Sequence, residues 1–215
     1  MIKLYFSPLA CSLATRIALY EAGAEARFIQ VDGKTKQTDS SENFLTVSPL
    51  GLVPTLLDGE QRVLENAAVL QYIARRFPEA RLAPRDERGT AQLQQWLCFI
   101  GTELHKAIYM PLLDKAAHDE VKAYALRRVE SRFAWLEQHL TERSFLLDEF
   151  SVADTYLFAV LNWSMVTPVD LKRWPAVHSY HERLGTRPSV ARAFAEELAL
   201  YRRELLEREA EAKAS

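Results

Sequence analysis

The stretch Tyr5-Phe-Ser-Pro-Leu-Ala-Cys-Ser-Leu-Ala-Thr-Arg16 joins a short apolar strand to a helix and places a cysteine at the junction. Residues 2–6 have the β-branched and aromatic character of a buried strand, and Ser7-Pro8 ends that run. Apolar residues then recur at helical spacing: Leu13, Ile17 and Tyr20. We therefore expect a helix that begins near Cys11 or Ser12, with the cysteine in its first turn and Arg16 turned away from the core.

A cysteine at this position has two interpretations. The unpaired N–H groups and the dipole of a helix N-terminus stabilise a thiolate, so the pKa of Cys11 would fall below its usual value. Helix N-terminal cysteines are a recognised reactive class. Free cysteine is also a common small core residue. Position alone leaves a reactive Cys11 and a structural Cys11 both open.

Composition and charge exclude several classes of protein. Of the 215 residues, 48% are hydrophobic, which is enough for one or two globular domains. The net charge is −2 without a basic stripe, and the apolar runs are too short to cross a membrane, so we expect neither a nucleic-acid nor a membrane partner. Ser7 and Pro8 interrupt any export signal. Cys11 and Cys98 are too few for a disulfide framework and too far apart for a zinc knuckle, so we expect a cytoplasmic protein without a metal.

The first 77 residues have the pattern of a β-α-β unit followed by a β-β-α unit. The expected strands are residues 2–6, 26–31, 55–57 and 62–64. The last two flank Asp58-Gly59, a strong hairpin signal. A polar loop at 32–48, with a short irregular helix at 43–47, separates the two units. Parallel strands joined by a helix, then a hairpin and a covering helix, describe an α/β thioredoxin-like domain.

The rest of the chain has helical periodicity. After a linker at 78–86, an all-α domain at 87–215 is expected to contain helices at 87–109, 118–140, 152–166, 175–187 and 189–200, and then a charged, fraying tail. Pro111 should end the first of these helices. Ser151 and Asp154 form a reciprocal cap on the very apolar helix 152–166, and we interpret both as structural.

Several motifs, in order and over nearly the whole chain, resemble the glutathione transferase family. They are Ser7-Pro-Leu-Ala-Cys11-Ser, Leu52-Val53-Pro54-Thr55-Leu56, Glu65-Asn66, Phe150-Ser-Val-Ala-Asp154 and Arg187-Pro-Ser-Val-Ala-Arg-Ala-Phe194. Cys11-Ser12 together with Glu103-Leu-His105-Lys106 most resembles the bacterial beta class. Asn66, Cys98 and Leu9 depart from residues that are frequent in that class. The resemblance implies a thioredoxin-like domain at 1–77 that binds glutathione and a helical domain with an electrophile pocket.

The resemblance also implies how glutathione is held. Val53-Pro54 would be a cis peptide, with the Val53 backbone facing the cysteinyl part of the tripeptide. Glu65 would pair with the γ-glutamyl ammonium, Asn66 would offer N–H donors to the adjacent carboxylate, and Lys36 would meet the glycine carboxylate. Taken singly, Glu65 and Asn66 are also good helix-capping residues, and Lys36 is an ordinary loop lysine.

Further candidates surround the glutathione sulfur. The resemblance brings His105 and Lys106 across from the second domain toward Cys11. Tyr5 and Ser12 are candidate hydroxyl donors, although Tyr5 also suits packing at the strand end. Cys98, Thr102 and His105 share one stripe of an α-helix, which adds Thr102 to the ligand-binding candidates. The electrophile pocket is expected from Leu9, Tyr109, Met110 and Trp163.

The function that the resemblance implies is that of a homodimeric cytosolic glutathione transferase active in detoxification. Cys11 would form a mixed disulfide with glutathione, giving thiol transfer, and the enzyme would conjugate glutathione to small electrophiles. One alternative is a glutathione-dependent isomerase or dehalogenase on the same fold. Another is a glutathione-binding or regulatory protein without catalysis.

Overall fold

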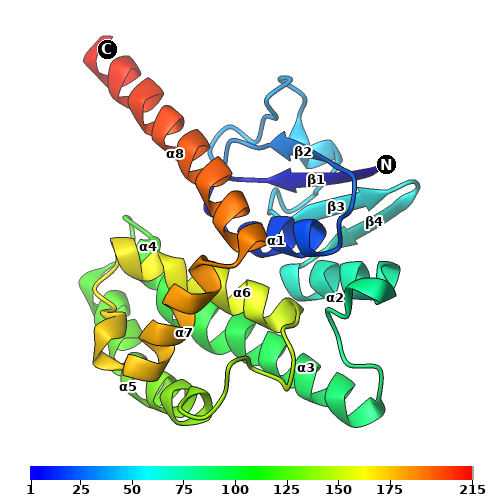
Figure 1. Cartoon of the computed structure of the whole chain (residues 1–215). Coiled ribbons are helices and arrows are strands. Elements are labelled where there is room, and N and C mark those ends of the chain that lie inside the picture. The colour runs from blue at the N-terminus through cyan, green and yellow to red at the C-terminus, as the bar shows by residue number, and fades with distance from the viewer. Residues whose placement is uncertain (215) are drawn as a thin grey trace.

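A four-stranded mixed sheet organises the first part of the chain (Figure 1). The computed structural model describes residues 1–214. The strands β1 (Ile2–Phe6), β2 (Ala26–Gln30), β3 (Thr55–Asp58) and β4 (Gln61–Leu64) lie in the order β2-β1-β3-β4. Strand β1 is parallel to β2 and antiparallel to β3, and β3 is antiparallel to β4. The expected thioredoxin-like topology is confirmed.

The two faces of the sheet have different partners because successive strand residues point to opposite sides. Helices α1 (Leu13–Glu21) and α2 (Asn66–Arg76) both lie on one face (Figure 1), where Leu4 and Phe6 join the main core. On the other face, Tyr5 packs with Ile29, Val31 and Phe44 in a smaller cluster. Phe44 belongs to the short helix η1 (Phe44–Thr46), which confirms the helical turn expected at 43–47.

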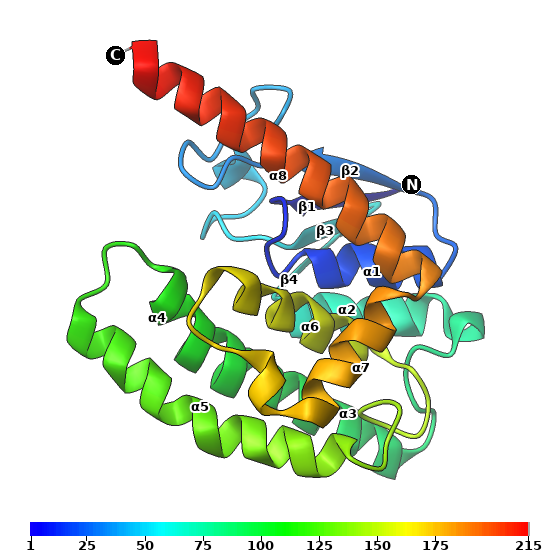
Figure 2. The ribbon, with the colours of Figure 1, turned by 60° about the vertical axis from the view of Figure 1, so that its left-hand side comes forward.

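The rest of the described chain consists of helices joined by loops. They are η2 (Pro78–Ala80), α3 (Glu87–Phe99), η3 (Ile100–Tyr109), α4 (Met110–Leu113), α5 (Asp119–Leu140), α6 (Val152–Leu161), η4 (Asn162–Val166), η5 (Leu171–Arg173), α7 (Pro175–Gly185) and α8 (Pro188–Ala214). Every residue of α6 is buried, and α6 packs against α1 (Figure 2). One continuous apolar cluster therefore runs from the sheet through α1 into the helical part. Among residues 1–214, no helix combines the length and apolarity that a membrane crossing requires.

Two of the expected helices change helix type along their length. The helix expected at 87–109 changes at Ile100 from α-helix to π-helix, η3. Pro111 does not end it, because α4 follows η3 without a break in helical backbone and Pro111 is the second residue of α4. The helix expected at 152–166 is α-helical only to Leu161, and Val166 at the end of η4 is 67% exposed.

The expected cap of α6 is confirmed and reaches further than the sequence indicated. The Ser151 hydroxyl accepts from the Ala153 N–H at 3.3 Å, and Asp154 Oδ2 accepts from the Ser151 N–H at 2.8 Å. The other oxygen of Asp154 accepts from the Leu146 N–H at 2.9 Å and from the Tyr180 hydroxyl at 2.7 Å. One buried carboxylate thus joins the start of α6 to the preceding loop and to α7.

Replacing this carboxylate should destabilise the whole fold. Asp154→Ala leaves several buried donors without an acceptor, and each such donor costs about 1–3 kcal/mol. We expect a loss of about 4 kcal/mol in the free energy of unfolding, measured by urea denaturation. The fully exposed Asp148 provides the matched control Asp148→Ala, which should lie within about 0.5 kcal/mol of the wild type. If Asp154→Ala lowers the free energy of unfolding by less than about 1 kcal/mol, Asp154 only caps α6 and does not hold the loop and α7.

Candidate functional site

Cys11 lies in the turn that precedes α1. Its residue is 9% exposed, and its thiol donates to the Val53 carbonyl oxygen at 3.4 Å. Burial raises the pKa of this thiol to about 12, and the Lys106 ammonium lowers it by less. The neighbouring N–H groups of Leu13 and Ala14 already donate to backbone carbonyls at 3.0 and 3.2 Å. The expected lowering of the Cys11 pKa is therefore wrong for this state, in which the sulfur is a protonated donor.

The Val53-Pro54 bond is cis, as the family resemblance implied. Asn66 then fixes the cysteine from the other side. Its side-chain amide donates to the Cys11 carbonyl oxygen at 3.1 Å and accepts from the Thr15 hydroxyl at 3.0 Å. The turn that carries Cys11 is thus held by the loop before β3 and by the first residue of α2.

Glu65 precedes Asn66 with an unusual backbone. Its φ is +65° with ψ 124°, and its side chain is exposed. A non-glycine residue in such a region costs about 1–3 kcal/mol and persists where the surroundings impose it, often at binding sites. Its side chain makes no capping hydrogen bond to α2, so a helix cap does not account for this carboxylate.

His105 reaches the site from η3. Its Nδ1 lies 2.8 Å from the Tyr156 hydroxyl, and its ring packs against Trp163 with centroids 4.9 Å apart. Burial, and to a smaller extent Lys106, lowers the pKa of His105 to about 4, so the imidazole is neutral at pH 7.

The expected stripe of Cys98, Thr102 and His105 does not form. Cys98 and Thr102 are exposed, whereas His105 is buried. The π-helix begins between Cys98 and Thr102, and its wider turn breaks the 3.6-residue spacing on which that stripe depended. The Thr102 hydroxyl donates to the Cys98 carbonyl oxygen at 2.9 Å, within its own helix.

Tyr156 is a site residue that the sequence analysis missed. It lies on α6 and contacts His105. Burial raises the pKa of the Tyr156 hydroxyl, and the negative charge of a Cys11 thiolate would raise it further. The available signal was a polar group, the Tyr156 hydroxyl, in a helix whose other polar residues are Asp154 and Thr155.

Neither hydroxyl candidate is free to serve Cys11. Tyr5 is on the opposite face of the sheet, where its ring stacks on Phe44 at 5.5 Å between centroids. The Ser12 hydroxyl is fully buried and is bonded to both the N–H and the carbonyl of Ser7, at 3.3 Å each. The structure therefore corrects both assignments: Tyr5 packs the sheet and Ser12 closes the turn.

The four expected pocket residues divide between core and surface. Tyr109 is completely buried, with its hydroxyl 2.6 Å from Ser164 Oγ, so it belongs to the core. Met110 is 41% exposed. Leu9 has a left-handed φ of +57°, and its carbonyl accepts from the Trp163 indole N–H at 2.9 Å. Leu9 and Trp163 therefore join the Cys11 turn to the helical part.

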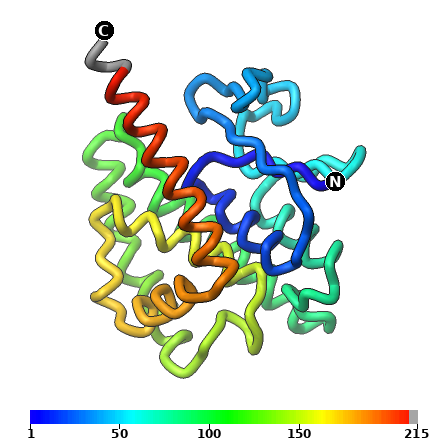
Figure 3. Tube along the Cα trace, turned by 45° about the horizontal axis from the view of Figure 1, so that its top comes forward, coloured from blue at the N-terminus to red at the C-terminus, as the bar shows by residue number. Residues whose placement is uncertain are grey.

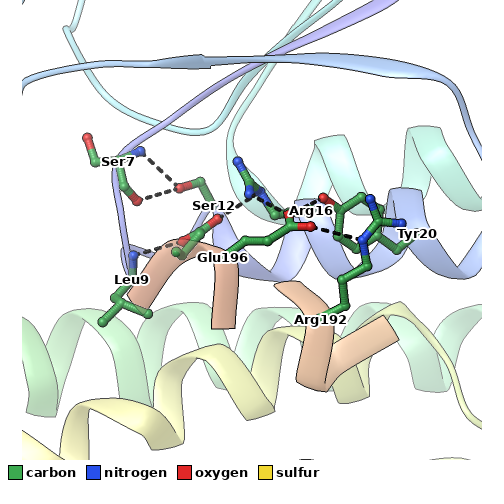
Figure 4. Close-up of polar contacts among 8 residues, drawn as sticks. Ser7, Leu9, Ser12, Arg16, Tyr20, Arg192 and Glu196 are labelled. Carbon is green, nitrogen blue, oxygen red and sulfur yellow. Dashed lines mark hydrogen bonds and ion pairs between the residues drawn. The ribbon is translucent and has the colours of Figure 1, made fainter. Parts of the chain in front are cut away.

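A buried ion cluster fastens the same turn to α8 (Figure 4). Arg16 is only 4% exposed, contrary to expectation, and lies between the rings of Phe6 and Phe28. Its guanidinium lies 3.2 Å from Glu197 Oε1, and its Nη1 donates to Glu196 at 3.1 Å. Burial raises the pKa of Glu197, and the Arg16 guanidinium opposes this shift. Glu197 Oε2 also accepts from the Leu9 N–H at 2.8 Å.

Lys36 is the remaining predicted ligand residue. Its φ is +57°, and its ammonium donates to the Gly51 carbonyl oxygen at 3.0 Å. Gly51 lies two residues before Val53, so Lys36 borders the segment that faces Cys11.

Comparison with known proteins agrees with this geometry. A model of the glutathione S-transferase N-terminal domain matches residues 2–75, and one of the C-terminal domain matches residues 115–183. Glutathione S-transferase GstA of Escherichia coli O157:H7 is 31% identical over 199 residues, covering 91% of this chain and 98% of its own. The chain belongs to the glutathione S-transferase family. It is an enzyme of that family, and its α/β thioredoxin-like domain and helical domain are those of the family fold.

Solved structures of transferases support the same class. The ternary complex of BphK, a bacterial transferase, has 41% identity and a TM-score of 0.87, and it covers 91% of this chain and 98% of its own. A sphingomonad transferase complexed with glutathione has 40% identity and a TM-score of 0.86 over the same shares. A beta-class transferase from Sphingomonas chungbukensis has 41% identity, a TM-score of 0.86 and the same coverage. The resemblance to the bacterial beta class is confirmed.

The neutral His105 should make the fold sensitive to acid. The unfolded chain binds a proton at this group near pH 6.5, whereas the folded chain binds it only near pH 4. Between these values the unfolded state holds more protons, so stability falls as the pH falls. The shift corresponds to about 3 kcal/mol, which should appear as a loss of urea resistance between pH 7 and 4.5.

The variant His105→Gln should lack this component and retain a hydrogen-bonding side chain toward Tyr156. His118, which is exposed at the start of α5, offers the control His118→Gln, which should keep the wild-type pH dependence. Identical pH profiles for wild type and His105→Gln would show that His105 is not held neutral by the fold.

Proposed function

We propose that this transferase binds glutathione on its thioredoxin-like part with the tripeptide sulfur facing Cys11, and that it transfers thiols through a Cys11–glutathione mixed disulfide. Conjugation of glutathione to small electrophiles would use the same bound tripeptide. The observation that carries the proposal is the contact between the Cys11 thiol and the carbonyl of Val53, next to the cis proline. A ligand that uses the Val53 peptide would lie directly beside that sulfur.

Charged and polar groups near this contact suit the rest of the tripeptide. The exposed Glu65 carboxylate would pair with the γ-glutamyl ammonium, and the Asn66 N–H at the start of α2 would donate to the neighbouring carboxylate. Lys36 would exchange its bond to the Gly51 carbonyl for the glycine carboxylate. The glutathione in the related sphingomonad structure supports a glutathione site in this chain.

The thiol-transfer step is a disulfide exchange. A base in solution takes the Cys11 proton, and the thiolate attacks one sulfur of oxidised glutathione. The Cys11–glutathione bond forms while the original S–S bond breaks, and the second glutathione leaves as a thiolate. Lys106 would stabilise the anionic sulfur, since its ammonium already lowers the Cys11 pKa. His105 and Tyr156 would contribute neutral hydrogen-bonding groups.

The family resemblance also supports the biological setting of the proposal. We include in it a homodimer that acts in the cytoplasm in detoxification. Size-exclusion chromatography with light scattering measures the dimer directly.

The reaction of Cys11 with oxidised glutathione should accelerate steeply with pH. Because the pKa of Cys11 is about 12, the thiolate fraction rises about tenfold per pH unit between pH 7 and 9. The rate can be followed by intact mass in a Cys98→Ala variant, which keeps Cys11 as its one cysteine. A rate that does not change above pH 7 would contradict this prediction, because it would mean that the pKa of Cys11 lies below 7 when the protein reacts with oxidised glutathione.

The same experiment separates a binding site from simple thiol reactivity. In Cys98→Ala, modification should saturate with oxidised glutathione and be inhibited by S-methylglutathione, which has no free thiol. In the matched variant Cys11→Ala, the exposed Cys98 should react without saturation and without inhibition. Absence of modification in Cys98→Ala, or inhibition in neither variant, would refute the proposed role of Cys11.

A further inference from the structure

Residues 204–208 of α8 contact the thioredoxin-like part. The helix rises from the helical part past the end of β2, toward its own C-terminus (Figures 1 and 3). A fraying, solvated tail was expected from Tyr201 onward. That expectation is wrong for Glu204 and Arg208, which make specific contacts with residues of the first domain.

Glu204 is the centre of these contacts. Its Oε1 accepts from the Gln30 side-chain amide at 2.6 Å, and its Oε2 lies 3.4 Å from Arg208 Nη2. The same nitrogen of Arg208 lies 3.8 Å from Asp32 Oδ2. The Glu204 side chain is only 17% exposed, so its contact with Gln30 is largely shielded from water. A polar chain thus runs from the last residue of β2 through α8 to Asp32.

Gln30 and Asp32 hold one end of the loop at residues 32–39. Asp32 Oδ1 accepts from the N–H groups of Lys34 and Thr35 at 2.6 and 2.9 Å. The Asp32 carbonyl accepts from the Lys36 N–H at 3.0 Å. At the other end, the Asp39 N–H donates to the Gln30 carbonyl at 2.9 Å. Both ends of the loop therefore depend on the two residues that α8 contacts.

Lys36 is the functional residue of this loop. It occupies the left-handed region at φ +57°, which a lysine adopts only where its surroundings hold it. Its ammonium lies against the Gly51 carbonyl and so beside the segment that leads to Val53. A displacement of the loop would move this ammonium relative to a ligand bound at Val53.

We propose that the end of α8 is a brace for the glutathione site, in which Glu204 and Arg208 are positioning residues that act through Lys36. The inference rests on the proposed function, in which Lys36 binds the glycine carboxylate of glutathione. It also assigns a specificity to the brace. The brace matters for thiols that carry that carboxylate and has no effect on γ-glutamylcysteine, which lacks the glycine.

The test compares binding of glutathione and γ-glutamylcysteine to full-length variants by calorimetry. Glu204→Ala should weaken glutathione binding about fivefold and leave γ-glutamylcysteine binding unchanged. Glu204→Gln, which keeps an oxygen acceptor, should restore most of the affinity. Glu207 lies on the same helix, is 65% exposed and has only a 3.9 Å contact with Arg203, so Glu207→Ala is the matched control and should bind both thiols normally.

A second comparison shows whether the effect passes through Lys36. In a Lys36→Ala background, Glu204→Ala should produce no further loss of glutathione affinity. The brace is refuted if Glu204→Ala leaves glutathione binding unchanged, weakens both thiols equally, or adds its full effect to that of Lys36→Ala. Failure of the wild type to bind either thiol would instead reject the proposed function, and the brace with it.

Discussion

The buried contact between Arg16 and Glu197 connects the two parts of this molecule. Taking both charges out of water is costly, and the pair persists because Phe6, Phe28, Glu196 and the Leu9 N–H surround it. Through Leu9 this contact reaches the turn that carries Cys11 and, by the Leu9 carbonyl, Trp163. The position of the sulfur is thus set by the last helix as much as by the first.

Around that sulfur, burial is the dominant electrostatic effect. It keeps the Cys11 thiol protonated and His105 neutral. The positive charge of Lys106 lowers the pKa of both groups, by less than burial changes them. The side chains of Cys11, His105 and Tyr156 therefore form an uncharged group of hydrogen-bonding partners, bordered by the exposed Lys106 and Glu65.

Local patterns in the sequence predicted most of the fold. Three local features are confirmed: the buried apolar strand at residues 2–6, the Asp58-Gly59 hairpin and the Ser151–Asp154 cap. Each depends on residues that are neighbours in the chain. The errors concern features that distant residues decide. Burial of Arg16 requires α8, and the pKa of Cys11 requires packing from several elements. The π-helix at Ile100–Tyr109 interrupts the 3.6-residue periodicity, and the sequence pattern did not indicate this change. Tyr156 looked like one more core residue of α6.

The apolar cluster that passes from the sheet through α1 into α6 limits how such enzymes can be recombined. A chimera that takes residues 1–77 from one relative and the helices from another would place two unmatched apolar surfaces in contact between α1 and α6. Exchanges that keep α1, α6 and the start of α8 from a single parent preserve that surface. A division of the chain between residues 77 and 87 would cut across this shared apolar cluster.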